Sequence, residues 1–321
     1  MQLIINGLSK TYANGVRALK DVSLTLGNGM FGLLGPNGAG KSSLMRTIAT
    51  LQEADTGVIS LQGIDGAGPA GSYGSDGMER LHAESGSGSL DMLKDKTRVR
   101  QLLGYLPQEF GVYPRIPAEQ MLDHIARLKG ITNAQQRKEL VDALLDNVNL
   151  YKDKKKSLGT FSGGMKQRFG IAQALIGNPK LIIVDEPTAG LDPAERNRFY
   201  NLLSHLGENT IVILSTHIVE DVSTLCSRFA IICQGEVLYS GEPDTAVSEL
   251  EGKIYSLSIP KESILRYRER FGVISTQLKA GRLYIRIIQD TDPGEGFQPA
   301  APNLEDVYFS NIATKVDVNM I

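Results

Sequence analysis

The chain has 321 residues, a length that suits about two domains. Of these residues 41% are hydrophobic and 22% charged, which is enough apolar material for a packed core and excludes a disordered protein. Its formal net charge of −2 provides no basic field for binding nucleic acid. The two cysteines are too few for a disulfide scaffold or a four-cysteine zinc site, and no apolar run approaches the roughly 18 residues of a membrane helix.

The N-terminal part of the chain alternates short apolar segments with turns, a pattern that predicts strands. Strands are expected over 3–12, 21–26 and 30–34, the last of them short and apolar. A glycine-rich loop follows, then residues 42–51 with helical spacing, then another strand over 58–63. The N-terminus is predicted to be an amphipathic strand rather than a secretory signal, because it lacks a basic region and a long apolar core.

Residues 66–90 differ from the rest of the chain in composition. They contain seven glycines and five serines, which is the composition of a flexible linker. Two origins are open: a natural expansion of a surface loop, or an engineered insertion with MERLHAES between Gly/Ser spacers. Composition favours the second, and in neither case do we expect these residues to carry chemistry.

The middle of the chain is predicted to be helical, with helices over 117–130 and 137–150 in a helical subdomain over 110–160. From residue 161 helices and strands alternate, which is typical of a parallel sheet covered on both faces. The expected helices are 163–177, 193–207 and 218–226, and the expected strands are 181–185, 210–216, 229–233 and 236–241.

The pattern restarts after about residue 245 with a small β-α-β unit and a closing helix. Its expected elements are a strand over 254–259, a helix over 262–272, a strand over 283–290 and the closing helix over 304–312. We therefore predict two domains, residues 1–242 and a smaller accessory domain over 243–321.

The strongest local motif is GPNGAGKS at 35–42, which matches G-x-x-x-x-G-K-[ST] between a buried strand and a helix. Its glycines let the backbone N–H groups face one concavity, which together with the helix N-terminus makes an anion site. Lys41 is expected to reach the β- and γ-phosphates of a nucleotide, and Ser42 to bind Mg²⁺. The predicted nucleotide-binding loop consists of Gly35, Pro36, Asn37, Gly38, Ala39, Gly40, Lys41 and Ser42.

Two carboxylates end the apolar run LIIVDEP at 181–187. Asp185, at the tip of a buried strand, suits the coordination shell of Mg²⁺. Glu186, one residue later, projects elsewhere and is expected to orient or deprotonate a water. A glutamate at this place argues for hydrolysis by the chain itself rather than transfer to a second substrate.

A second helix N-terminus with small residues occurs in FSGGMKQR at 161–168. Ser162, Gly163 and Gly164 precede the helix and offer exposed N–H donors, which makes a second phosphate site on the same chain. One nucleotide does not readily need both sites in one monomer. We therefore expect two copies to pack head to tail, each giving this segment to the nucleotide of the other.

The motifs occur in one order: GPNGAGKSS, Gln108 in YLPQ, FSGGMKQR, LIIVDEP, AGLDP at 189–193 and His217 after TIVILST. The set resembles the nucleotide-binding subunits of ABC transporters over about residues 1–240. The resemblance implies an α/β P-loop NTPase fold of the ABC type, with a mostly parallel sheet core, an antiparallel β-subdomain and a helical subdomain, followed by a small C-terminal α+β domain. It also implies an ATPase that uses ATP and Mg²⁺.

The resemblance implies a role for further single residues. Tyr12 is expected to stack on adenine, Ser43 to add a hydroxyl near the phosphates, and Asp192 to communicate across the dimer. Gln108 resembles the glutamine that touches Mg²⁺ and the attacking water, and His217 resembles the switch histidine at the γ-phosphate. The catalytic set implied in this way is Lys41, Gln108, Glu186 and His217.

The signature departs from the family's commonest form, LSGGQ, because Phe161 and Met165 stand at its outer positions. The central Ser-Gly-Gly is intact, but the usual glutamine contact is lost. Phe and Met at these positions resemble the subset in which a separate ATPase chain serves a small exporter-type membrane subunit. We therefore expect an exporter, with the chain peripheral on the cytoplasmic face of the membrane.

The expected partners are a second copy of the chain and a separate integral-membrane permease, with no nucleic acid. The surface near Gln108, Phe110 and Tyr113 is the candidate docking site for the permease. The main alternative is a soluble ABC-type ATPase that couples nucleotide-driven dimerisation to a partner outside transport.

Overall fold

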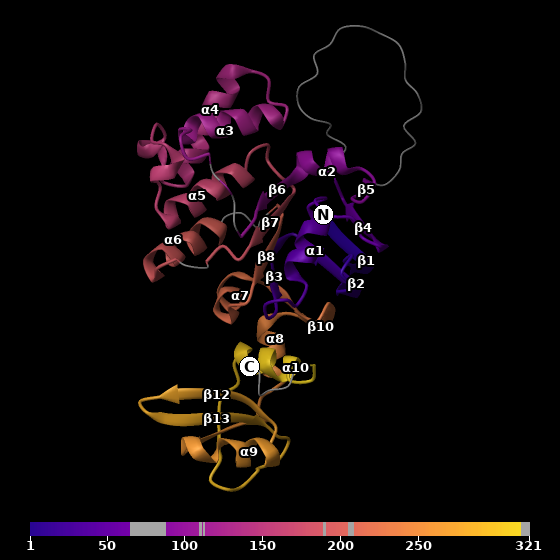
Figure 1. The fold of residues 1–321 in the computed structure, drawn as a ribbon, viewed down its shortest axis with the longest axis vertical. Coiled ribbons are helices and arrows are strands. Elements are labelled where there is room, and N and C mark those ends of the chain that lie inside the picture. Colours follow the sequence, from indigo (N-terminus) through magenta and orange to yellow (C-terminus); the bar gives the residue numbers. More distant parts are fainter. Residues whose placement is uncertain (65–87, 109–110, 112, 189–190, 205–208, 316–321) are drawn as a thin grey trace.

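The structure is a computed structural model that describes residues 1–64, 88–108, 111, 113–188, 191–204 and 209–315. It consists of a larger body and a smaller one joined at a narrow waist (Figure 1). The larger body contains the six-stranded core sheet, and the smaller one contains a separate four-stranded sheet (Figure 1).

The core sheet has the strand order β10-β9-β3-β8-β7-β6. Strands β6, β7, β8, β3 and β9 are parallel, and β10 pairs antiparallel with β9. This arrangement confirms the predicted mostly parallel sheet. The strands are β3 (Gly29–Leu34), β6 (Leu103–Leu106), β7 (Leu181–Asp185), β8 (Ile211–Thr216), β9 (Arg228–Cys233) and β10 (Glu236–Gly241).

The two faces of the core sheet have different covers. Val212 and Leu214 of β8 face a core formed with the helices, whereas Ile211 and Ile213 face α1 and an antiparallel sheet. Because successive side chains of a strand point to opposite faces, the four apolar residues that begin β8 fill both cores. The helices are α1 (Lys41–Ile48), α2 (Lys96–Leu102), α3 (Ala118–Leu128), α4 (Ala134–Asn147), α5 (Gly163–Ala174), α6 (Pro193–Ser204) and α7 (Val219–Leu225).

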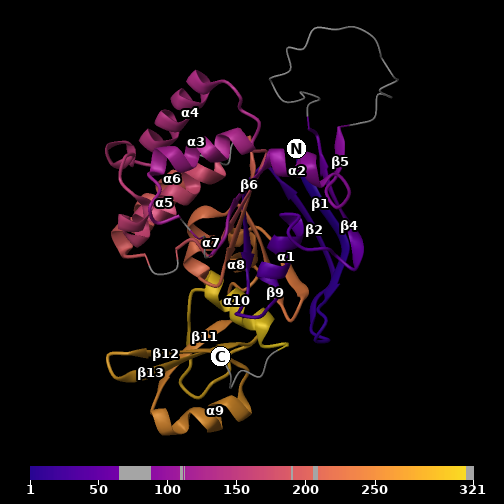
Figure 2. The ribbon, with the colours of Figure 1, turned by 45° about the horizontal axis from the view of Figure 1, so that its top comes forward.

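Short 3₁₀ segments at Tyr151–Asp153 and Leu158–Thr160 connect α4 to α5. Figure 2 shows α3, α4, α5 and α6 gathered on one side of the core sheet and the strands of the antiparallel sheet on the other. The described part of the predicted helical subdomain is thus largely helical. The sequence patterns did not predict β6, because its four residues continue directly from α2 with no turn signal between them.

The antiparallel sheet has the order β2-β1-β4-β5 and is built from β1 (Gln2–Thr11), β2 (Arg17–Gly27), β4 (Thr56–Gln62) and β5 (Ser89–Asp91). Strand β5 corrects the C-terminal limit of the expected linker. Ser89 and Leu90 lie inside the predicted segment 66–90, yet they pair with β4, and Leu90 is only 3% exposed. The rest of that segment up to residue 87 lies outside the described residues.

The C-terminal region forms the sheet β12-β13-β11-β14 with antiparallel pairing. The expected succession of strand, helix and strand is present, but an additional strand, β12, lies between the helix and the second of these strands. The residues of β12 were not predicted as a strand, because they are largely polar and exposed beyond the first two. The elements are α8 (Pro243–Ser248), β11 (Ile254–Ile259), the 3₁₀ turn Lys261–Ser263, α9 (Ile264–Arg270), β12 (Val273–Lys279), β13 (Arg282–Ile288), β14 (Gln298–Pro299) and α10 (Leu304–Ile312).

Helix α10 joins the two bodies. Its buried residues Leu304, Val307, Tyr308 and Ile312 belong to the same core as β9 and α7, whereas the accessory sheet has a core of its own. Asn303 and Asp306 form a capping box at its start. The division into domains at 242/243 stays a prediction, since this helix packs on the larger body.

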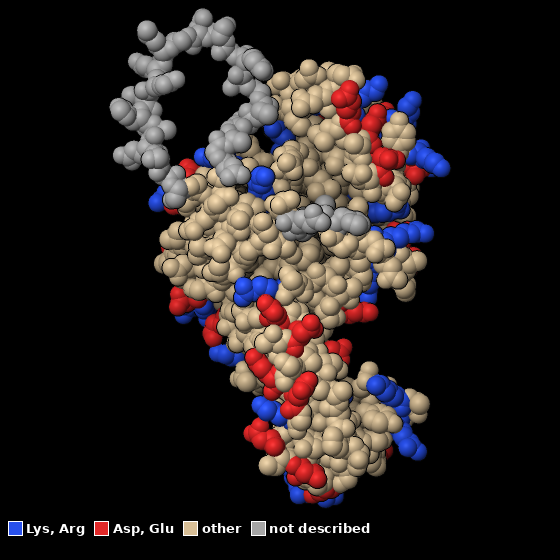
Figure 3. All heavy atoms as spheres, turned by 180° about the vertical axis from the view of Figure 1, so that it is seen from behind, with Lys and Arg blue, Asp and Glu red and all other residues tan. Residues whose placement is uncertain are grey.

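Charged side chains are spread over the face shown in Figure 3, with Asp and Glu gathered at the waist. Helix α8 lies there (Figure 1), and exposed acidic residues surround it. They are Glu242, Asp244, Glu249 and Glu251. Among the described residues, no helix is both long enough and apolar enough to span a bilayer.

Candidate functional site

The site begins with the loop between β3 and α1. Gly38 and Gly40 have φ angles of 78° and 108°, a region that favours glycine. A Cβ on Gly40 would also lie 2.4 Å from the carbonyl oxygen of Ala18. The loop therefore requires glycine for its shape, and it leaves the N-terminus of α1 facing a cavity of about 870 Å³.

The carboxyl ends of β3, β7 and β8 bring the other polar residues to this loop. The register places Leu34 beside Thr216 and Asp185 beside Ser215. The Glu186 N–H donates to the Ser215 carbonyl at 2.8 Å, which continues the pairing one residue beyond β7. Loops that follow adjacent parallel strands lie at one edge of the sheet, where ligands of such folds bind.

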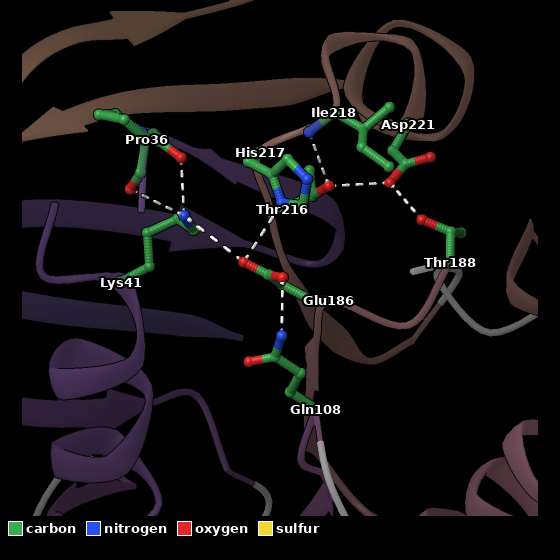
Figure 4. Close-up of polar contacts among 10 residues, drawn as sticks. Pro36, Lys41, Gln108, Glu186, Thr188, Thr216, His217, Ile218 and Asp221 are labelled. Atoms are coloured by element: carbon green, nitrogen blue, oxygen red, sulfur yellow. Dashed lines mark hydrogen bonds and ion pairs between the residues drawn. The ribbon is translucent and has the colours of Figure 1, made fainter. Parts of the chain in front are cut away.

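Glu186 is the centre of a polar cluster that Figure 4 shows. Its carboxylate lies 3.7 Å from Lys41 Nζ and 3.4 Å from His217 Nδ1, and it accepts a 3.0 Å hydrogen bond from Gln108 Nε2. Its φ of 47° is a left-handed value that non-glycine residues rarely adopt. The structure thus brings together the four residues predicted to be catalytic.

Lys41 is 4% exposed, and its ammonium group donates to the carbonyls of Gly35 and Pro36 at 2.6 and 3.1 Å. Burial lowers the pKa of Lys41, an effect that the charges of Glu186 and Asp185 oppose. Burial also raises the pKa of Asp185, and the nearby Glu186 charge adds to this rise. A compact group of charges is therefore held where water is largely excluded.

The oxygen ligands expected for Mg²⁺ fit such an ion in their chemistry. Among the described residues, Asp185 Oδ1 is buried with no hydrogen-bond partner, and so is the Ser215 hydroxyl beside it. No group of three or more His, Cys, Asp or Glu residues forms a closed metal cage within the described residues. Mg²⁺ is commonly held by one or two protein oxygens together with substrate phosphates, so an open site of this kind suits it.

Tyr12 lines the cavity from the end of β1, and its hydroxyl group contacts Ser43 Oγ at 2.8 Å and Gln52 Oε1 at 2.9 Å. The cavity lining also includes residues that the sequence motifs did not indicate, namely Arg17 and Lys20 at the start of β2 and Gln234 after β9. They belong to no motif, and only the folding of β2 and β9 around α1 brings them to the cavity.

Ser162, Gly163 and Gly164 lie apart from the cavity at the N-terminus of α5. The Ser162 side chain accepts from the Met165 N–H at 3.2 Å, and Ser162 and Gly163 are exposed. Asp192 also lies outside the cavity lining and accepts from the Glu195 N–H at 2.8 Å near the start of α6. In the docking candidate Tyr113 is 63% exposed, while Phe110, like Gly190 of AGLDP, lies outside the described residues.

A buried polar group beside the site was missed by the sequence patterns. It consists of Thr188, Thr216 and Asp221, which are at most 1% exposed and joined by hydrogen bonds. The available signal was Asp221 itself, a carboxylate in the first turn of a short helix between two buried strands.

Comparison with known proteins shows which family the chain belongs to. The family model of ABC transporters matches residues 19–189. The uncharacterized ABC transporter ATP-binding protein YxlF of Bacillus subtilis is 31% identical over 261 residues, covering 81% of this chain and 77% of YxlF. The chain belongs to the ABC transporter family.

Two further relatives agree with this ABC assignment. The linearmycin resistance ATP-binding protein LnrL of Bacillus subtilis is 34% identical over 236 residues, covering 73% of this chain and 67% of LnrL. A solved ATP-binding subunit of an ABC transporter superposes with a TM-score of 0.62 at 27% identity, covering 78% of this chain and 93% of that one. The predicted family, the ABC-type P-loop fold and the ATPase activity are confirmed.

Proposed function

We propose that this ABC ATPase hydrolyses ATP in the cavity at α1 and thereby drives a separate membrane permease, as an exporter. The observation that supports this most is the convergence of Lys41, Gln108, Glu186 and His217 beside a loop of backbone N–H donors. Phosphoryl transfer needs positioning and charge stabilisation rather than covalent work by the protein, and this cluster supplies both.

Each residue of the cluster has a distinct task in the proposed reaction. Lys41 and the loop N–H groups bind the β- and γ-phosphates, and Tyr12 stacks on the adenine. Glu186 accepts a proton from the water whose oxygen attacks the γ-phosphorus, as the bond to the ADP oxygen breaks. Gln108 and His217, both beside the Glu186 carboxylate, orient that water and the γ-phosphate.

Asp185, Ser42 and Gln108 would hold Mg²⁺ beside the phosphates. The ion would supply a positive charge that neutralises the phosphate oxygens. The Asp185 carboxylate oxygen that lacks a partner among the described residues supports this assignment, because a bound cation would satisfy it.

We also propose that two copies of the chain enclose two ATP molecules, with Ser162, Gly163 and Gly164 of each completing the site of the other. The exposure of Ser162 and Gly163, away from their own cavity, supports a contact with a second chain. Asp192 lies at the start of α6 and takes part in the same interface. The permease would dock near Gln108 and Tyr113, at the cytoplasmic face of the membrane.

The test of this proposal is Glu186→Gln, which keeps the side-chain shape but removes the base. We expect ATP turnover to be lost and an ATP-bound dimer to accumulate, measured by phosphate release and by size-exclusion chromatography with ATP. A matched control is Glu220→Gln, a more exposed carboxylate in α7 with a 71% exposed side chain, which should leave both readouts as they are. Full turnover by Glu186→Gln, or a monomer in the presence of ATP, would contradict the proposal.

A soluble ABC-type ATPase with a partner outside transport is the second candidate. The two candidates differ in what the chain binds in the cell. Co-purification with an integral-membrane protein, lost when Tyr113 is changed to Asp, supports transport.

A further inference from the structure

Asp221 is a fully buried carboxylate next to the site, with a relative exposure of 0%. It lies in the first turn of α7 and accepts hydrogen bonds from three hydroxyl groups. Oδ2 accepts from Thr188 Oγ1 at 2.7 Å and from Thr216 Oγ1 at 2.8 Å, and Oδ1 accepts from the Tyr200 hydroxyl group at 2.5 Å. Figure 4 shows Thr188 and Thr216 on either side of this carboxylate.

Burying Asp221 in this way lowers the stability of the fold. Burying a carboxylate costs free energy unless it is paired, and no ion pair joins Asp221 to a Lys, Arg or His in the described part of the chain. The three hydroxyl donors offset part of that cost. Burial raises the pKa of Tyr200, and the hydrogen bond to Asp221 raises it further, so the hydroxyl group stays protonated and remains a donor. An apolar residue would serve packing alone at lower cost.

Two of the three donors come from the loops that carry Glu186 and His217. Thr188 lies two residues after Glu186, and Thr216 lies immediately before His217. The Thr216 hydroxyl also accepts from the Ile218 N–H at 3.0 Å, which ties both sides of His217 to Asp221. One carboxylate oxygen therefore connects the segment that follows Glu186 with the segment that carries His217, although β7 and β8 are separate strands.

We infer that Asp221 is a positioning residue for ATP hydrolysis, which fixes the catalytic glutamate and the switch histidine relative to each other through Thr188 and Thr216. The inference rests on the proposed roles of Glu186 and His217. Asp221 touches neither nucleotide nor metal in this assignment. Its effect is to hold Glu186 and His217 in position, and small displacements of reacting groups lower the reaction rate steeply.

The test uses the full-length chain with Asp221→Asn. The amide keeps only one acceptor oxygen, so whichever way it is turned its NH₂ group faces at least one of the three hydroxyl donors. The hydrogen bonds that remain also lose the strength that the carboxylate charge gives them, so the threonines are held less firmly. We expect kcat to fall by roughly ten- to a hundredfold per folded molecule. The Kd for ATP stays within about twofold, because the cavity lining is intact. Thr216→Val should likewise lower kcat and leave the Kd for ATP unchanged. Thr216→Ser keeps the hydroxyl group and should therefore keep kcat near the wild-type value.

The control for stability is Val222→Ala, the next residue of α7, which is also 0% exposed. It removes packing in the same helix without touching the hydrogen bonds. A purely structural role predicts equal loss of kcat in Asp221→Asn and Val222→Ala at equal loss of thermal stability, and that result would overturn the inference. In a His217→Ala background, the effect of Asp221→Asn on kcat should shrink, since the two changes act on one unit.

The outcomes separate this inference from the proposed function. If Glu186→Gln abolishes turnover while Asp221→Asn retains wild-type kcat, the inference fails and the proposed function stands. If Glu186→Gln hydrolyses ATP at the full rate, the proposed function fails whatever Asp221 does. A parallel rise of the ATP Kd in Asp221→Asn would show that Asp221 acts on binding, which also overturns the inference.

Discussion

Lys41 illustrates at the scale of one residue how the site is prepared before a nucleotide binds. Its ammonium group satisfies two loop carbonyls and pairs with Glu186, so the buried charge is never without partners. Phosphate oxygens would replace these weaker partners. The cavity is then shaped by the chain's own contacts in advance, which reduces the ordering needed on binding.

Replacing Lys41 by Met keeps the aliphatic stem and removes the charge. We expect the Kd for ATP to rise by at least about tenfold, or about 1.4 kcal/mol, because a charge-assisted contact to the phosphates is lost. Adenosine, which has no phosphate, should bind as before, and calorimetric titration with both ligands measures the difference. Lys20→Met is the control: Lys20 lines the same cavity but pairs with Glu236. Equal loss of ATP affinity in the two variants would contradict the assignment of Lys41.

Sequence patterns selected residues that the structure brings together where the motifs have a fixed order, and the roles of these residues stay predictions. The glycines of the phosphate loop with Lys41, then Glu186, then His217 each follow the carboxyl end of a buried strand, β3, β7 and β8, so motif and geometry coincide. Asp221 was missed, because its role depends on two donors that precede it in the chain and meet it only after β7 and β8 pair. Contacts of that kind leave no local signal.

At the scale of elements, β5 shows where composition is an incomplete guide. Its serine and preceding glycine match a linker, but Leu90 supplies the apolar contact that places the strand in the sheet. Strands β6 and β12 were missed for related reasons: one is very short, and the other is polar along most of its length. Pairing partners, rather than their own residues, make these segments strands.

The junction around β5 predicts which shortening of the chain is tolerated. Ile64 N–H donates to the Gly88 carbonyl at 3.2 Å, so the two ends of the segment 65–87 already meet. Replacing 65–87 by an Asn-Gly turn should leave ATPase activity within about twofold of wild type, because loop length has little effect on closure.

Removing 66–91 instead takes away β5 as well. The loss of buried Leu90 should lower the free energy of unfolding by about 1.5–3 kcal/mol, which thermal unfolding measures. The comparison of the two deletions is the control. If both variants unfold at the same temperature as the full chain, β5 contributes nothing to the sheet.

At the scale of the whole molecule, the accessory sheet and the ATPase body are connected by α10 and its cap. Arg286 of β13 forms two 2.7 Å hydrogen bonds with the Asp306 carboxylate, which is 1% exposed and also caps α10. Helix α10 in turn packs on α7, which carries Asp221. A continuous series of contacts thus leads from the accessory sheet to the helix next to the catalytic loops.

This packing predicts that a chain ending at residue 242 is not stable on its own. The four buried side chains Leu304, Val307, Tyr308 and Ile312 would be removed, at an upper estimate of roughly 6–12 kcal/mol, which is comparable to the whole stability of a domain. We expect such a chain to aggregate or to unfold at much lower temperature. Circular dichroism and ATP turnover of the soluble fraction measure both effects.

The matched control for this truncation is Ile285→Ala, which damages only the separate core of the accessory sheet. If α10 rather than the accessory sheet stabilises the ATPase body, this variant should loosen the sheet yet keep ATP turnover close to wild type. A chain ending at 242 that stays folded with full turnover would instead support the predicted division at 242/243. The last helix would then belong to the accessory domain in function, and its contacts with α7 would contribute little to the ATPase body.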